Sequence, residues 1–430
     1  MTLNWVQIFR LGLVQLCLGA IVVLTTSTLN RLMVVELALP AVVPGALVAL
    51  HYGIQISRPN WGFRSDTKGN RTQFVIGGMG VLGLGAFLAA LGVVVMTTAP
   101  VLGMGLSVLA YAMIGVGVGA SGTSLLALLA TTTAPHRRAA AATITWLMMI
   151  FGIAVTAGTV GAFLDPYTPA LLLRIVGVVT GGAVVLTVAA IWGIERRVIA
   201  IREAETAPFR QGLTEIWAEP KARAFTLFIF FSMTAYFLQE LILEPYAGLV
   251  FGLTPGQSTQ LSGAQNGGVF VGMLLVGVAA TGLRFGALRT WVVAGCIGSA
   301  LSLMVIAALG QMAIGMIVPA VVMLGFFNGM FAVAAIGSMM ALASDGRRGR
   351  EGTRMGLWGA AQALAAGFGG LLGAVLVDMF RLTLDAAAAF GSVFVAEAGL
   401  FALSALIAAR VIDDRRGGRT PVSAIAVPGE

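Results

Sequence analysis

Residues 58–71 read Arg-Pro-Asn-Trp-Gly-Phe-Arg-Ser-Asp-Thr-Lys-Gly-Asn-Arg, a basic and turn-rich stretch between two long apolar runs. Within it, Gly62, Asp66, Gly69 and Arg71 follow the spacing Gly-x3-Asp-x2-Gly-x-Arg. Glycine supplies backbone angles that other residues rarely adopt, and Asp is a good cap for the N-terminus of a helix. The stretch therefore predicts a tight polar loop that joins two hydrophobic helices.

The composition of the whole chain excludes an ordinary soluble protein. Of its 430 residues, 58% are hydrophobic and only 10% are charged, and the mean hydropathy is +0.95. A soluble domain carries about 25% charged residues. Glycine is abundant, at 57 residues, as is usual where membrane helices pack closely. The chain is therefore predicted to be an integral membrane protein.

Twelve segments are long and apolar enough to cross a membrane, since a helix needs about 20 apolar residues to span a hydrocarbon core about 30 Å thick. They are residues 10–30, 38–57, 73–97, 101–130, 141–163, 168–193, 224–245, 262–282, 288–309, 311–341, 355–378 and 388–410. The fourth and the tenth are longer than a span requires, so we expect them to tilt or to extend beyond the bilayer.

One long polar interruption divides these segments into two sets of six. The predicted units are an N-terminal half at 1–193, a cytoplasmic linker at 194–223, a C-terminal half at 224–411 and a cytoplasmic tail at 412–430. Weak internal similarity supports a duplication, because Gly115-x3-Gly119 is repeated as Gly325-x3-Gly329 and each precedes a pair of arginines. The predicted fold class is an all-α integral membrane protein with twelve transmembrane helices in two six-helix halves.

The basic residues predict the orientation of the chain in the membrane. All of the 26 Lys and Arg residues except Arg31, Arg174 and Arg381 fall on the side of the membrane that holds both termini. Cytoplasmic segments are enriched in Lys and Arg, so both termini are predicted to be cytoplasmic. The same topology, with contact to anionic lipid, explains the net charge of +8. A nucleic-acid partner is therefore not expected.

The loop at 58–71 resembles the signature loop between the second and third helices of the major facilitator superfamily. Three stretches, at 29–37, 63–66 and 243–248, resemble the PucC family, a branch of that superfamily in photosynthetic bacteria; the last reads Leu-Glu-Pro-Tyr-Ala-Gly. Residues 120–131 depart from the pattern, because they contain neither the His nor the Asp that other PucC-type proteins tend to carry. The resemblance is therefore to the short members associated with bacteriochlorophyll synthesis.

This resemblance implies the fold of the superfamily and a role in handling bacteriochlorophyll or in assembling light-harvesting complexes. It implies the bacterial inner (intracytoplasmic) membrane as the location, and bacteriochlorophyll or a precursor as a bound molecule that is not an intrinsic cofactor. Bacteriochlorophyll synthase and light-harvesting polypeptides are the implied protein partners. Older names describe members of this branch as a subunit of that synthase.

The signature loop is a candidate gate on the cytoplasmic side. Its candidate residues are Gly62, Arg64, Asp66, Gly69 and Arg71. An ion pair that Asp66 makes in only one of the two forms of the protein would shift the equilibrium between the inward-facing and the outward-facing form. The alternative is a fixed turn in which Asp66 caps a helix.

Four charged residues near the outer ends of the first and seventh segments form a candidate proton or ion-pair site. Glu240 and Glu244 are one helical turn apart and are predicted to share a face. Two close carboxylates share a proton readily, which suits a proton site. Arg31 and Glu36 are expected to meet them from the other half. The alternative is an exposed acidic rim with a structural ion pair.

His51 is a candidate ligand for the magnesium of a bacteriochlorophyll, because neutral imidazole can bind a metal. The alternative is a histidine that packs through hydrogen bonds. Four amides are candidate polar residues of a cavity, or else they link neighbouring helices; they are Gln55, Asn266, Asn328 and Gln362. Glu397 lies within an apolar run and is not expected to face lipid.

The sequence contains no recognisable catalytic motif: no His and Cys metal cluster, no phosphate-binding loop and no Gly-x-Ser-x-Gly turn. Cys17 and Cys296 lie inside apolar runs, which argues against a disulfide framework or a zinc site. The chain is therefore not expected to be an enzyme or to hold a metal. The leading hypothesis is a protein that handles or delivers bacteriochlorophyll during assembly of the photosynthetic apparatus. The alternatives are a proton-coupled transporter of a small solute and a non-catalytic subunit of bacteriochlorophyll synthase.

Overall fold

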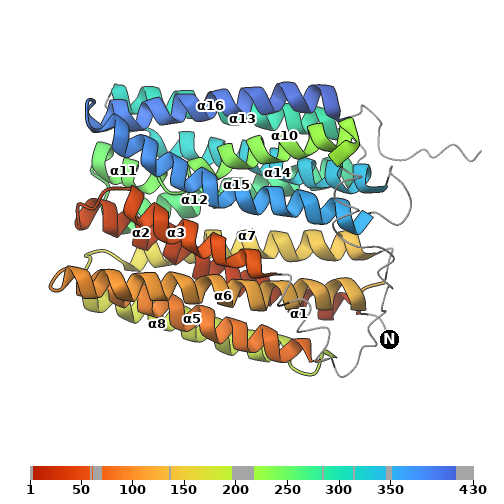
Figure 1. The fold of residues 1–430 in the computed structure, drawn as a ribbon, viewed down its shortest axis with the longest axis horizontal. Helices are drawn as coiled ribbons and strands as arrows, with labels where there is room; N and C mark the ends of the chain where they lie inside the picture. The colour runs from red at the N-terminus through yellow and green to blue at the C-terminus, as the bar shows by residue number, and fades with distance from the viewer. Residues whose placement is uncertain are drawn as a thin grey trace, which may run out of the picture.

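The structure is a computed structural model that describes residues 3–58, 61, 70–134, 137–195, 217–282, 285–312, 315–344 and 351–412. Over these residues the chain forms helices and connecting turns, and no strand (Figure 1). The helices run along one common long axis. This arrangement suits a membrane, because a helix satisfies its backbone polar groups within itself.

The first half opens with one continuous rod, Trp5–Glu36. It consists of α1 (Trp5–Val23) and α2 (Leu29–Arg31), each followed by a π-helical turn, Leu24–Thr28 and Leu32–Glu36. Single π turns inside helices are frequent at functional sites. The other helices of this half are α3 (Val42–Ile54), α5 (Arg71–Met96), α6 (Pro100–Thr132), α7 (Arg138–Phe163) and α8 (Pro169–Ile191).

The second half repeats this organisation after the linker. Its helices are α10 (Pro220–Leu238), α11 (Leu243–Phe251), α12 (Pro255–Val276), α13 (Leu288–Gln311), α14 (Ile317–Ser344), α15 (Glu351–Phe380) and α16 (Ala386–Val411). A further π-helical turn, Gly277–Gly282, continues α12.

The twelve predicted segments correspond to these elements, which confirms the predicted fold class. Among the described residues, eleven helices are long and apolar enough to span a membrane, and the shorter apolar helix Val42–Ser57 supplies the remaining one. The tenth span begins at Ile317 rather than at residue 311, because α13 continues to Gln311. The linker predicted at 194–223 falls largely outside the described residues.

The seventh and eighth spans differ most from the prediction. The sequence predicts one helix at 224–245, but α10 ends at Leu238 and α11 starts at Leu243. Pro245 explains the new start, since proline lacks an N–H donor and is favoured in the first turn of a helix. The eighth span begins at Pro255 instead of residue 262. Thr254 and Gln257 cap this start reciprocally, each side chain bonding the backbone N–H of the other.

Each half has its own hydrophobic core. The core of the second half includes Trp358, Phe225 and Phe331, and that of the first half includes Tyr111 and Leu11. The two halves meet along two helix pairs, in which α7 packs on α12 and α3 packs on α15.

The repeated glycines serve equivalent helix contacts in the two halves. A Cβ atom at Gly115 of α6 would lie 2.7 Å from the carbonyl oxygen of His51 in α3. A Cβ atom at Gly325 of α14 would lie 2.0 Å from the carbonyl oxygen of Gln265 in α12. Only glycine permits such close approach of two backbones. The duplication therefore preserves the packing of the fourth helix of each half on the second.

Gly272→Ala is expected to destabilise the protein, whereas Gly267→Ala on the same helix is not. At Gly272 a Cβ atom would lie 2.1 Å from the carbonyl oxygen of Phe326, while at Gly267 it would meet nothing within 4 Å. Overpacking typically costs about 1–3 kcal/mol, and Ala in an open helical position gains up to about 1 kcal/mol over Gly. Thermal unfolding in detergent measures both; equal melting temperatures would contradict the close contact of α12 and α14.

Candidate functional site between the two halves

The two ends of the helix bundle are named after the parts of the chain that they hold. The terminal end holds the start of α1 and the end of α16, and the far end holds α2 and α11 (Figure 1). Polar and charged side chains from both halves meet toward the far end. The far-end cluster is defined as Ser27, Arg31, Glu36, Glu244 and Ser262.

Ser27 links the halves at the centre of the far-end cluster. Its hydroxyl donates a hydrogen bond to the carboxylate of Glu244 in α11, and it lies 2.9 Å from the hydroxyl of Ser262 in α12. Ser27 belongs to the π-helical turn Leu24–Thr28, all of whose residues are buried. The polar run Thr-Thr-Ser-Thr at 25–28 is thus placed against the second half.

Arg31 is the cation of the far-end cluster. Its guanidinium pairs with Glu36 at 2.5 Å and donates to the carbonyl oxygen of Leu253, in the other half, at 2.8 Å. The Arg31 side chain is 3% exposed, whereas that of Glu36 is 41% exposed. Gly248 leaves the space for this side chain, since a Cβ atom there would lie 3.2 Å from the guanidinium.

Glu244 lies within the protein and not on an exposed rim. It is 2% exposed, and its Oε2 atom has no hydrogen-bond partner among the described residues. The Arg31 guanidinium acts on it electrostatically. A carboxyl group held by hydroxyls, next to a cation and between two halves, is of the kind that often marks an ion or proton pathway in membrane proteins.

The structure brings Arg31, Glu36 and Glu244 together, and it places Glu240 and Glu244 on either side of the start of α11. Glu240 lies in the turn between α10 and α11 and Glu244 lies in the first turn of α11, so a proton site shared by the two carboxyl groups stays a prediction. Glu240 lies beside Thr26 of the first half.

His51 is 1% exposed in α3. Its Nε2 atom lies 2.6 Å from the amide nitrogen of Gln55, and its ring stacks on Tyr52 with centroids 4.7 Å apart. The Gln55 oxygen accepts a hydrogen bond from Arg58. The predicted residues His51 and Gln55 therefore form one hydrogen-bonded chain on the first half, which favours the packing interpretation; pigment ligation stays a prediction.

The other predicted amides differ in their surroundings. Asn328 is fully buried and accepts a hydrogen bond from Ser299 at 2.8 Å, which links α14 to α13. Asn266 donates to the carbonyl oxygen of Ser262 on its own helix at 3.0 Å. Gln362 is half-buried on α15. Asn328 thus acts as an interhelical link, and a cavity role for these amides stays a prediction.

Most of the predicted gate lies outside the described residues, namely Gly62, Arg64, Asp66 and Gly69. Arg71 is described and begins α5. Its backbone N–H donates to Glu195 at 2.8 Å, and its guanidinium donates to the hydroxyl of Thr131 on α6. Glu195 also accepts from the backbone N–H of Thr72 at 2.8 Å, so it caps α5. The hydropathy pattern gave no sign of this cap.

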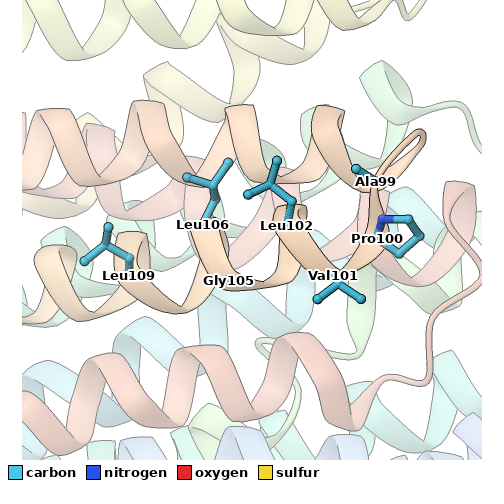
Figure 2. Close-up of a pocket in the computed structure, with 7 residues that line it drawn as sticks. All are labelled: Ala99, Pro100, Val101, Leu102, Gly105, Leu106 and Leu109. Carbon is cyan, nitrogen blue, oxygen red and sulfur yellow. The ribbon is translucent and has the colours of Figure 1, made fainter.

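A surface pocket of about 700 Å³ lies at the start of α6 (Figure 2). Its lining is Ala99, Pro100, Val101, Leu102, Gly105, Leu106 and Leu109. Specific binding sites combine an apolar wall with a few polar groups that orient the ligand. The side chains of this pocket supply no such group, and its position suits lipid contact.

The fold is that of a transporter of the major facilitator superfamily. A D-xylose–proton symporter superimposes with a TM-score of 0.72 at 15% identity, covering 95% of this chain and 98% of the symporter. A bacterial homologue of the human lysosomal transporter Spinster, in an inward-facing and unoccupied conformation, gives a TM-score of 0.70 at 15% identity, over 95% of this chain and 98% of that one.

The chain belongs to the PucC family, because the family model described as PUCC protein matches residues 28–416. It is 69% identical over 422 residues to the Bacteriochlorophyll synthase 44.5 kDa chain of Rhodobacter capsulatus, covering 98% of this chain and 99% of that protein. It is 29% identical to Protein PucC of Rhodobacter capsulatus, over 86% of this chain and 84% of that protein. The resemblance seen in the sequence is confirmed.

Proposed function

We propose that this multi-pass membrane protein handles or delivers bacteriochlorophyll, or a precursor, while pigment is made and photosynthetic complexes are assembled. The observation that carries the proposal is the 69% identity, over nearly the whole of both chains, to a protein named for bacteriochlorophyll synthase. The transporter-type fold supports a role in moving or holding a molecule rather than converting it.

The proposed partners follow from the same cargo. They are bacteriochlorophyll synthase, which would supply the pigment, and light-harvesting polypeptides, which would receive it. The proposed location is the bacterial inner (intracytoplasmic) membrane, with the terminal end in the cytoplasm as the excess of Lys and Arg indicates. The pigment would be cargo and not a resident cofactor.

A proton-coupled transporter of a small solute is the second candidate. The observation that favours it is Glu244, a buried carboxylate with an unpartnered oxygen at the contact of the two halves. Ionisable groups inside a membrane bundle often mark ion or proton pathways. A non-catalytic subunit of the synthase is the third candidate, and it rests on the name of the relative alone.

The absorption spectrum of the purified protein tests the proposal. The protein is isolated in mild detergent from cells that make bacteriochlorophyll, beside an unrelated membrane protein prepared in the same way. We expect bacteriochlorophyll or a precursor to co-purify with this chain and not with the control. A colourless protein that moves a solute into liposomes under a proton gradient would favour the second candidate.

His51→Leu separates ligation from packing at this residue. Because His51 contacts Gln55, we expect the variant to retain pigment and to lose about 1–3 kcal/mol of stability. This is the usual cost of leaving a buried polar group without its hydrogen-bond partner. Both are measured, by absorption and by thermal unfolding. His136→Leu, which changes the other histidine of the chain, is the control. Loss of pigment at unchanged stability would instead assign His51 as the magnesium ligand.

A further inference from the structure

Asp378 reaches from one half of the protein to the other. It lies near the far end of α15, in the second half, and is half-buried. Its Oδ1 atom accepts from the backbone N–H of Ala41 at 2.9 Å, and its Oδ2 atom accepts from that of Val42 at 2.7 Å. These amides stand at the N-terminus of α3, in the first half, where backbone donors lack partners within the helix.

Asp165 makes the converse connection. It follows α7 in the first half and is exposed. Its Oδ1 atom accepts from the backbone N–H of Gly256 at 3.1 Å, and its Oδ2 atom accepts from the hydroxyl of Thr254. Both partners stand at the N-terminus of α12, in the second half. A Cβ atom at Gly256 would lie 2.5 Å from the Asp165 carboxylate, so only glycine admits this approach.

The two connections are related by the duplication of the fold. Each carboxylate lies at the far end of the fifth helix of its own half, and each caps the second helix of the other half. Carboxylates are favoured at helix N-termini because of the free N–H groups and the helix dipole. Asp385 provides a contrast, because it caps α16 within its own half by accepting from the N–H of Ala388 at 3.1 Å.

We propose that Asp165 and Asp378 form a pair of matched clasps that hold the far end of the two halves closed. Alternating access in this superfamily requires the halves to rock about a central site, so contacts across the far end must break and reform. These clasps suit that task, since both carboxylates lie near the end of the bundle where water can solvate the separated groups. The proposal concerns the movement of the halves and does not depend on the cargo.

Electron paramagnetic resonance distances between spin labels test the clasps. Cysteines for labelling replace the exposed residues Ala170 and Leu382, one in each half at the far end, after Cys17 and Cys296 are changed to Ala. In Asp165→Ala/Asp378→Ala we expect a longer far-end distance to gain population, by about tenfold relative to the closed one. Each single variant should show a smaller shift.

Two controls keep the result interpretable. Asp385→Ala removes a helix cap of the same kind within one half and should leave the far-end distance unchanged. A second label pair, at the exposed residues Gln73 and Thr290 of the terminal end, should shorten in the double variant if the halves rock. Helix content from circular dichroism verifies folding. A folded double variant with the parent's distances at both ends would overturn the proposal and leave two static caps.

Discussion

Cells that lack this protein are expected to lose most of their light-harvesting complexes while every chemical step of bacteriochlorophyll synthesis continues. A protein that delivers pigment controls how much pigment reaches the complexes. It does not carry out the conversion of one intermediate into the next. The complexes should therefore decline without the accumulation of one dominant biosynthetic intermediate. Pigment extraction and the near-infrared absorption of isolated membranes measure the two effects.

The same strain separates the three candidate functions. Restoring the wild-type chain should restore the complexes, which controls for effects on neighbouring genes. Accumulation of one defined unprenylated precursor would contradict delivery and favour a subunit of the synthase. Normal complexes, with a defect in uptake or export of a solute, would contradict delivery and favour the transporter.

The arrangement of spans was predictable because lipid leaves a chain few choices. Backbone groups in the hydrocarbon region must bond within a helix, so apolar length alone placed the twelve segments. The start of α12 was missed for a related reason: Gln257, Ser258 and Thr259 lower the hydropathy of its first turns. The cap formed by Thr254, Pro255 and Gln257 is readable as a helix start, and it predicts the observed boundary better than hydropathy does.

The candidate site was predictable only in part. Arg31, Glu36 and Glu244 stand out because charges are rare in apolar runs, and the structure places them together. Their hydroxyl partners did not stand out, because serine in a membrane helix is common and Ser27 and Ser262 meet only through the packing of two halves. The roles of Asp165 and Asp378 carry no signal in the sequence, since the helices they cap are distant in sequence.

Arg31→Leu is expected to cause one of the largest losses of stability available from a single substitution at the far end. The change removes the donor to the Leu253 carbonyl oxygen and takes the cation away from the buried carboxylate of Glu244. Leaving a buried acceptor without its donor costs about 1–3 kcal/mol, and the change also removes the only ion-pair partner that Glu36 has among the described residues. Chemical or thermal unfolding in detergent measures the loss.

Two further variants identify which carboxylate depends on Arg31. Glu36→Gln should cost less than Arg31→Leu, because the amide oxygen can still accept from the Arg31 guanidinium and the side chain at position 36 is 41% exposed. Glu244→Gln added to Arg31→Leu should recover part of the lost stability, because it removes a buried carboxyl group that no longer has a cation near it. A double variant no more stable than Arg31→Leu would show that the two charges are not coupled. Glu244 would then be held by its hydroxyl partners alone, and the proton-coupled candidate would lose its cation.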